Sequence, residues 1–267
     1  MRTFKIIYII KSEGINGILL RVEHRCRKVK YKILHYFGSN KVKSIYGVLM
    51  KKNWLDATFR YCVEGAYGSF FCDHLRQKNT NFSFLDIGAN QGLYTLIAAQ
   101  NPNCINATCF EPVKETFLLL EENIKLNNVS NKCNAIKKGL GKKTENLRIF
   151  TRENHSGSAS LNNNFNFNEN VVEEEIEIVS SEIFNDIEIG NHEHPIICKI
   201  DVEGKEIDVL ENLTNSVIFN LIEEIFYEVD EMWVNPQDIQ DLLKKKGFKV
   251  FKKVGNNQNH YDVLATK

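Results

Sequence analysis

The sequence predicts an α/β fold, in which an open, mostly parallel Rossmann-like sheet carries helices on both faces. Three observations indicate this fold. Short apolar runs alternate with helix-like segments from about residue 82 onward. A turn containing Gly88 and Gly92 follows the first apolar run. Acidic residues stand at the ends of several runs, and in open α/β sheets ligands bind at the carboxyl ends of the strands.

The first part of the chain is predicted to be a helical extension. Apolar residues recur three or four positions apart between residues 15 and 37, which indicates a helix. Residues 54–78 are expected to form one or two more helices, rich in aromatic side chains. We therefore divide the chain into a basic helical extension, residues 1–80, and a ligand-binding domain, residues 81–267.

The core elements follow in a regular order. Strands are predicted from about residue 82 and at 105–110, 133–137, 146–151, 173–179, 196–200, 224–229, 248–254 and 261–266. Helices are predicted at 92–100, 113–127, 204–213 and 236–246; Pro112 is a favoured first-turn residue and Gly247 a favoured end. Residues 152–170, rich in Asn and Ser, are expected to form a loop. The last two strands form a closing β-hairpin.

The turn after the first strand predicts a ligand that contains a ribose. Gly88 and Gly92 lack a Cβ, so a ligand can approach the backbone closely there. Glu111 ends the next strand, where a carboxylate can accept hydrogen bonds from both ribose hydroxyls. A plain strand-to-helix turn with capping acids is the alternative interpretation.

The same region argues against phosphate-rich ligands. The dinucleotide pattern G-x-G-x-x-G fails because Asn90 and Leu93 stand where it needs glycines, and the phosphate-binding P-loop pattern is missing. Asp86 would repel a phosphate but can hold a cationic amine. S-adenosylmethionine fits this combination, because it has an amine, a ribose and a sulfonium but no phosphate.

Several motifs resemble, in the right order, those of the FkbM-type methyltransferases. They are Leu85-Asp-Ile-Gly-Ala-Asn-Gln-Gly-Leu-Tyr-Thr95, Phe110-Glu-Pro112, Gly139-Leu-Gly141, His155-Ser-Gly-Ser-Ala-Ser-Leu161 and Lys199-Ile-Asp-Val-Glu-Gly204. The resemblance covers roughly residues 56–267; it implies a class I methyltransferase sheet and, most often, O-methylation of sugars or natural products. The fourth motif departs from the consecutive glycines common in the family. The expected cofactor contacts are Asp86, Gly88, Asn90, Gly92, Tyr94, Thr95, Glu111, Pro112, Gly139 and Asp201.

Methyl transfer to a hydroxyl requires a group that accepts its proton. Asp201 and Glu203 follow the strand at 196–200 and so lie at the cofactor end of the sheet. Asp201 is our first candidate for the base or a metal ligand, Glu203 the second, and His155 a third. The alternatives are that the two acids merely cap the helix at 204–213, and that His155 is only solvated.

A metal-assisted mechanism is an alternative that we do not favour. Asp201, Glu203, Glu228 and Asp230 come from adjacent strand ends and offer only oxygen atoms, which suit Mg²⁺. Spacing alone does not bring them together. We therefore assign no metal ligands and expect S-adenosylmethionine as the cofactor.

The charge of the chain is unevenly distributed. The formal net charge is zero, but residues 1–53 hold 13 Lys and Arg against 2 acids, a balance of +11, and the remainder is −11. Two interpretations stay open: the basic segment packs on the acidic domain or on a partner subunit, or it contacts anionic lipid or a lipid-linked glycan. Nucleic acid is not expected, because no RNA-binding motif accompanies it. The oligomeric state stays undetermined.

Composition favours an intracellular protein. The seven cysteines include no C-x-x-C pair, which is typical of free thiols in a reducing cytosol. No apolar run reaches the roughly 18 residues of a membrane span. We therefore expect a cytoplasmic protein, with peripheral contact at the inner face of the membrane as an open alternative.

The expected function is O-methylation of a hydroxyl on a saccharide or glycoconjugate. Alternative functions are methylation of a small natural product or an N-nucleophile, aminopropyl transfer, and a non-catalytic cofactor-binding scaffold. The presence of both Asp201 and Glu203 argues against a scaffold.

Overall fold

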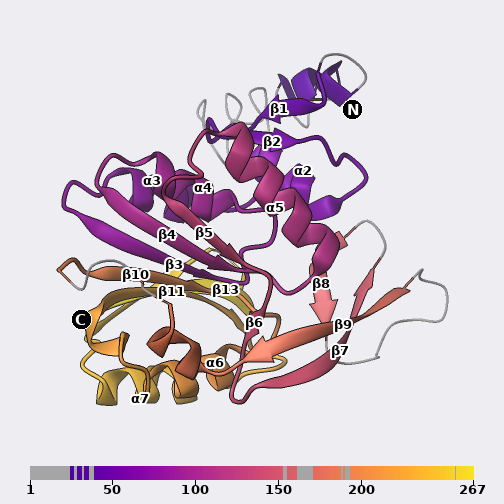
Figure 1. Cartoon of the computed structure of the whole chain (residues 1–267). Coiled ribbons are helices and arrows are strands. Elements are labelled where there is room, and N and C mark those ends of the chain that lie inside the picture. Colours follow the sequence, from indigo (N-terminus) through magenta and orange to yellow (C-terminus); the bar gives the residue numbers. More distant parts are fainter. Residues whose placement is uncertain are drawn as a thin grey trace, which may run out of the picture.

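A seven-stranded sheet forms the centre of the protein (Figure 1). The computed structural model describes residues 25–26, 29–31, 33–35, 39–152, 155–160, 171–187, 189, 193–255 and 257–267. From one edge to the other the strands are β12 (Val250–Val254), β13 (His260–Thr266), β11 (Ile222–Asp230), β10 (Ile196–Ile200), β3 (Phe82–Ile87), β4 (Cys104–Phe110) and β5 (Cys133–Ile136). The predicted α/β fold is confirmed.

The direction of the strands follows the predicted pattern. The five strands β11, β10, β3, β4 and β5 pair in parallel. β13 runs antiparallel to both β11 and β12, so the last two strands form the predicted closing hairpin. The central strands β3 and β10 are buried along their whole length, because helices cover both faces of the sheet.

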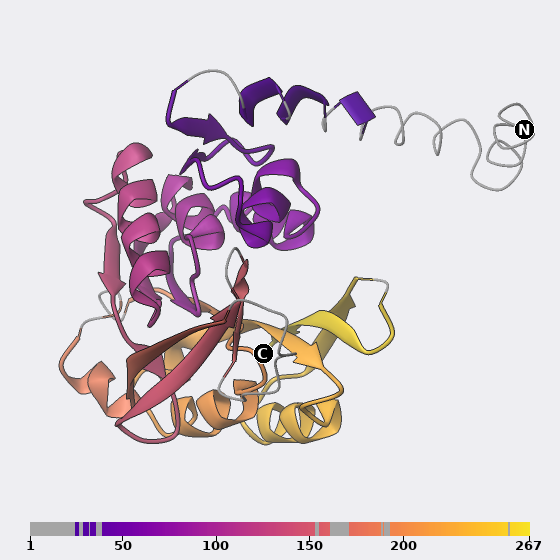
Figure 2. The ribbon, with the colours of Figure 1, turned by 90° about the vertical axis from the view of Figure 1, so that its right-hand side faces the viewer.

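Two hydrophobic clusters lie on opposite faces of the sheet. One joins the sheet to α2 (Ala57–Glu64), α3 (Ser69–Arg76), α4 (Leu93–Gln100) and α5 (Lys114–Leu126). The other joins it to α6 (Glu206–Leu213), α7 (Pro236–Lys245) and the short helices η1 (Ser181–Asn185) and η2 (Phe219–Leu221). Figure 2 shows the indigo and magenta helices above the sheet and the orange and yellow helices below it. The four helices predicted in the core are confirmed.

The part of the chain before the sheet contains strands as well as helices. The strands β1 (Lys41–Lys43) and β2 (Leu49–Lys51) form a hairpin that the sequence did not predict. The hairpin is held on α5, where the backbone N–H groups of Leu49 and Lys51 donate to Asn127 Oδ1 at 2.9 Å and to Asn123 Oδ1 at 2.7 Å. The helix predicted at 15–37 lies largely outside the described residues, although the described residues between 25 and 35 are helical.

The extension shares its core with the sheet. Met50, Phe59 and Phe71 belong to the same hydrophobic cluster as Phe84 in β3 and Leu96 in α4. The proposed division between residues 80 and 81 therefore runs through a continuous core. Among the described residues, no helix is long and apolar enough to cross a membrane.

A second sheet of four strands stands beside the first. Its order is β6 (Gly139–Leu140), β9 (Val171–Val179), β7 (Glu145–Arg152) and β8 (His155–Ser160). The prediction of a loop over 152–170 was wrong for residues 155–160, which pair with β7. These residues form a strand because contacts from distant parts of the chain hold them, as described below. Residues 161–170 lie outside the described residues.

Candidate functional site

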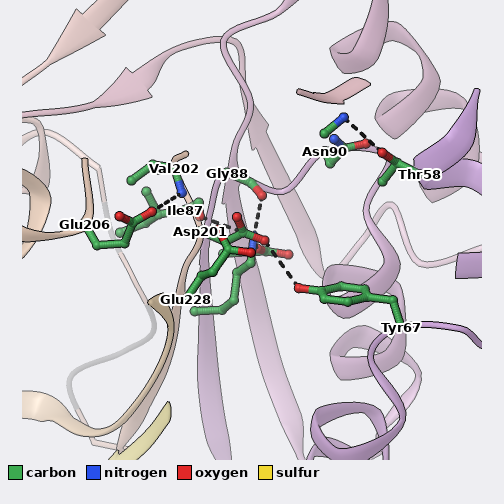
Figure 3. Close-up of polar contacts among 12 residues, drawn as sticks. Thr58, Tyr67, Ile87, Gly88, Asn90, Asp201, Val202, Glu206 and Glu228 are labelled. Atoms are coloured by element: carbon green, nitrogen blue, oxygen red, sulfur yellow. Dashed lines mark hydrogen bonds and ion pairs between the residues drawn. The ribbon is translucent and has the colours of Figure 1, made fainter. Parts of the chain in front are cut away.

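Acidic side chains and a glycine-rich turn meet at the carboxyl ends of β3, β10 and β11 (Figure 3). Gly88 follows β3, Asp201 follows β10, and Glu228 lies near the end of β11. The Asp201 N–H donates to the carbonyl oxygen of Ile87 at 3.1 Å, which joins the first two strand ends. The site predicted at this edge of the sheet thus draws on residues that are far apart in sequence.

Two of the predicted glycines are required by the close approach of the chain to itself. A Cβ built at Gly88 would lie 1.9 Å from the backbone oxygen of Asp201, and a Cβ built at Gly92 would lie 2.5 Å from Leu120 Cδ1. Both glycines also have positive φ angles, +77° and +90°. They let β10 and α5 pack against the turn and so fix its shape.

A buried lysine links Asp86 and Asp201. Lys199 Nζ lies 3.5 Å from an oxygen of each carboxylate and donates to the carbonyl oxygen of Gly88. Burial lowers the pKa of Lys199, but Asp201 and Asp86 more than offset this effect and raise it overall. Lys199 is only 3% exposed. The sequence analysis gave it no role, although a lysine inside an apolar strand requires a charged partner.

Asp86 is an internal partner of this lysine. It is fully buried, and Thr95 Oγ1 donates to its Oδ2 at 2.6 Å. Burial raises the pKa of Asp86, although Lys199 opposes the change. Its Oδ1 faces Lys199 Nζ at 3.5 Å. Thr95 is also buried and orients Asp86.

Glu111 clamps the glycine-rich turn. Its two oxygens accept hydrogen bonds from the backbone N–H groups of Asn90, at 2.9 Å, and Val113, at 3.0 Å. Asn90 has a φ angle of +49°, so the turn needs this support. Burial raises the pKa of Glu111 to about 7, even though both N–H groups favour its charged form.

Asp201 is the more accessible of the two aspartates. Its side chain is 24% exposed. The hydroxyl of Tyr67, from the segment between α2 and α3, donates to its Oδ2 at 3.3 Å, as Figure 3 shows. The extension therefore supplies a side chain to the site. Sequence analysis missed Tyr67, which carries no motif.

Capping of α6 falls to a different acid from those considered. Glu206 accepts hydrogen bonds from the N–H groups of Val202, at 3.0 Å, and Gly204, at 3.2 Å. Asp201 and Glu203 do not cap α6, because the N-cap residue of this helix is Lys205. Glu203 is exposed and adopts a φ angle of +53°.

Further acids line the β11 and β13 side of the site. Burial, and then the charge of Asp201, raise the pKa of Glu228 and also that of Asp262, the latter to about 7. His260 approaches two of the carboxylates, with 3.0 Å between its Nε2 and Glu228 Oε1 and 3.4 Å between its Nδ1 and Asp230 Oδ2. No group of three or more potential ligands able to hold a metal occurs in the described part of the chain. The Mg²⁺ alternative is therefore not supported.

The strand β8 is attached to the glycine-rich turn. The Ser156 N–H donates to Asp56 Oδ2 at 2.6 Å, and the Ser156 hydroxyl donates to Asn90 Oδ1 at 3.0 Å. The Gly157 N–H donates to Thr58 Oγ1 at 2.9 Å. Asp56 also accepts from Gln91 Nε2 at 3.0 Å and is buried. Asp56 and Thr58 were not predicted, because their partners lie about a hundred residues away.

Three further residues predicted from the sequence lie in different places. His155 begins β8, next to Ser156. It is not among the polar neighbours described for Asp201, which are Lys199 and Tyr67. Tyr94 is buried, with its ring centroid 5.1 Å from that of Phe71. Gly139 lies against Pro112, since a Cβ built on it would be 3.5 Å from Pro112 Cγ.

Comparison with known families gives the chain its place. The family described as Methyltransferase FkbM domain matches residues 86–250, which is more than half of the chain. The chain belongs to the FkbM methyltransferase family. It is thus a methyltransferase with a Rossmann-like sheet, as its motifs predicted.

Individual proteins and solved structures that resemble the chain have low sequence identity to it. Methyltransferase 1 of Beauveria bassiana (strain ARSEF 2860) is 28% identical over 180 residues, which cover 62% of this chain and 72% of that protein. The FkbM methyltransferase structure from Methylobacillus flagellatus KT is 15% identical with a TM-score of 0.47; the match covers 70% of this chain and 44% of the other. M. capricolum TrmK, solved with S-adenosyl-homocysteine, is 11% identical with a TM-score of 0.45 and coverages of 75% and 69%. This FkbM chain spans less than half the length of the M. flagellatus structure.

Proposed function

We propose that this methyltransferase uses S-adenosylmethionine and methylates a hydroxyl of a saccharide or glycoconjugate. One observation carries the proposal. The turn clamped by Glu111 and the partly exposed carboxylate of Asp201 lie side by side at the carboxyl ends of the parallel strands, where ligands bind in such folds. A site for the nucleoside and a site for proton removal are therefore adjacent.

The residues present suit this cofactor. Each oxygen of Glu111 accepts one backbone hydrogen bond and retains a further lone pair for a ribose hydroxyl. Lys199 is committed to Asp86, Asp201 and Gly88, so it is not available to bind a phosphate. The side chain of Asp201 is 24% exposed and that of Asp86 1%, so Asp201 is the aspartate that an acceptor hydroxyl can reach.

Asp201 is the proposed base. S-adenosylmethionine, when bound, supplies a methyl carbon made electrophilic by the sulfonium. Asp201 takes the proton of the acceptor hydroxyl, while Lys199 and Tyr67 hold its carboxylate in place. Orientation of the reacting groups can supply about 7–11 kcal/mol of the rate enhancement. Glu203, exposed at the rim, and His155, at the start of β8, are the second and third candidates.

The acceptor and the location are further parts of the proposal. The basic segment 1–53, with its balance of +11, would hold the enzyme at the cytoplasmic face of an anionic membrane, within reach of a lipid-linked glycan acceptor.

Radiolabelled methyl transfer tests the proposed function. The full chain is incubated with methyl-labelled S-adenosylmethionine and, separately, with free glycans, lipid-linked glycans and small hydroxylated aromatic compounds. We expect the label in a glycan, as a methyl ether that withstands mild base. Cleavage of the glycosidic bonds should then release the label together with the methylated sugar. Label in the aromatic compounds alone, or in an amine, would assign a different acceptor.

A further inference from the structure

The turn after β11 presents an exposed tryptophan. Trp233 is 53% exposed and Met232 76%, whereas Val234 is buried. The N–H groups of Trp233 and Val234 donate to the carbonyl oxygen of Asp230 at 2.9 and 3.0 Å, and the Met232 N–H donates to Asp230 Oδ1 at 2.9 Å. The exposure of the indole is therefore fixed by a hydrogen-bonded turn.

Trp233 lies against the segment that carries the proposed base. A Cβ built at Gly204 would lie 3.3 Å from both the Cβ and the Cγ of Trp233, and Gly204 has a φ angle of +89°. Gly204 directly follows Glu203 and stands three residues after Asp201. The indole thus begins on the Asp201–Gly204 turn and extends into solvent beside it.

The surroundings of Trp233 are acidic. Glu231 directly precedes Met232 and Trp233, and Glu203 directly precedes Gly204. The charges of Glu203, Glu228, Asp201 and Asp230 act on one another, so these acids form one group beside the turn. The neighbouring positive groups are already paired: Lys199 with Asp86 and Asp201, His260 with Glu228 and Asp230, and Lys205 with Asp208. An acceptor with its own negative charge would be repelled here.

Two tyrosines support Asp201 from the inner side of the site. Tyr94 is 4% exposed, and its ring centroid lies 5.9 Å from that of Tyr67, whose hydroxyl donates to Asp201. The side chains of Tyr94 and Tyr67 also interact through their hydroxyls. Asp201 is therefore held on this side, and its open side is the one next to Trp233.

We propose that Trp233 is the platform on which a pyranose ring of the acceptor stacks, and that this ring is neutral or carries an amino group. The negative face of the indole attracts the C–H groups of a sugar ring, and the neighbouring carboxylates accept hydrogen bonds from its hydroxyls. Asp201 stands three residues before Gly204, which contacts Trp233. This inference rests on the proposed saccharide acceptor.

The test compares the full chain with Trp233→Ala, Trp233→Phe and the control Val250→Ala, which changes an equally exposed side chain on β12. Methyl transfer from labelled S-adenosylmethionine is measured with methyl glycosides of glucose, glucosamine and glucuronic acid and with their oligomers. For the best acceptor, Trp233→Ala should raise KM about two- to tenfold, since stacking on an aromatic face is worth about 0.5–1.5 kcal/mol. Trp233→Phe should recover most of this loss, and Val250→Ala should change nothing.

Binding of S-adenosylhomocysteine, measured by calorimetry, separates the two proposals. All four proteins should bind it equally, and equal binding also shows that each variant is folded. If the wild type methylates a sugar and Trp233→Ala has the wild-type KM for that sugar, the platform would be overturned and the proposed function would stay intact. Preference for the glucuronic acid series would overturn the selection against negative charge. Binding without methylation of any sugar by the wild type would overturn the saccharide acceptor itself, and the platform with it.

Discussion

The backbone oxygen of Asp201 touches Gly88 so closely that a Cβ on this glycine would lie 1.9 Å from it. The carboxyl ends of β3 and β10 are therefore in direct contact. This contact sets the distance between the glycine-rich turn and the proposed base.

Gly88→Ala should accordingly disrupt the site. The new methyl group must displace the Asp201 backbone, and the φ angle of +77° adds strain. Denaturant unfolding should show a loss of more than about 1–3 kcal/mol, the usual cost of a strained backbone. Gly247→Ala is the matched control, because its φ angle is +97° but nothing lies within 4 Å of the added Cβ. Equal losses in the two variants would show that the contact with Asp201 is unimportant.

Glu111→Ala should weaken the binding of S-adenosylmethionine. The substitution removes the acceptor of the Asn90 and Val113 N–H groups and the proposed ribose contacts. Each hydrogen bond to a charged group contributes about 1.5–3 kcal/mol, so affinity should fall at least about tenfold. Calorimetry measures the affinity, and circular dichroism checks the fold. Unchanged affinity in a folded variant would remove the ribose from this position.

Glu111→Gln should change how stability depends on pH. Burial raises the pKa of Glu111 to about 7 in the folded protein, above the value of about 4.3 in an unfolded chain. The protonated form is therefore favoured by folding. Its stabilising effect is complete below about pH 4.3 and is lost as the pH rises through about 7.

The wild type should therefore lose on the order of 3 kcal/mol relative to Glu111→Gln between about pH 4 and pH 8. Urea unfolding of both proteins at several pH values gives this difference, and other titrating groups cancel. A difference that does not vary with pH would mean that folding leaves the pKa of Glu111 unchanged.

Asp201→Asn should abolish turnover and leave cofactor binding nearly unchanged. The amide keeps the shape of the side chain but cannot accept the proton, and general bases typically contribute about 10²–10⁴-fold. Single-turnover rates measure the effect, with Glu115→Gln, an exposed acid on α5, as the control. EDTA should not affect the wild type. A chelator-sensitive wild type, or an active Asp201→Asn, would require another mechanism.

The basic segment should bind anionic vesicles. Replacing the lysines and arginines of residues 21–32 by glutamine removes positive charges worth about 1 kcal/mol each near an anionic surface. Co-sedimentation at low salt should fall with these changes and, for the wild type, with added salt. Neutralising Lys244, Lys245 and Lys246 at the C-terminal end of α7 is the control. A wild type that does not sediment at low salt would leave the segment to subunit or intramolecular contacts.

The sequence predicted the sheet well because its strands are short apolar runs that end in acids. Periodicity therefore located β3, β10 and β11, and it located the edge where Asp201 and Glu111 stand. The same signal cannot reveal pairing across the sheet. Lys199 and Asp86 face each other in register on neighbouring strands, yet they are 113 positions apart in the sequence.

Local sequence also failed where distant contacts decide the structure. Residues 155–160 are rich in Ser, which favours a loop, but Asp56 and Thr58 hold the backbone of Ser156 and Gly157 in place. Tyr67 reaches Asp201 from the extension for the same reason. Such residues become visible only when the fold brings them together.

Calorimetric titration of the full chain with S-adenosylmethionine, and in parallel with NAD, tests the central claim most directly. The account predicts saturable binding of one S-adenosylmethionine per chain and none of NAD, because the turn after β3 offers Glu111 to a ribose but no site for a diphosphate. Tight binding of NAD, or no binding of S-adenosylmethionine by the folded protein, would contradict it.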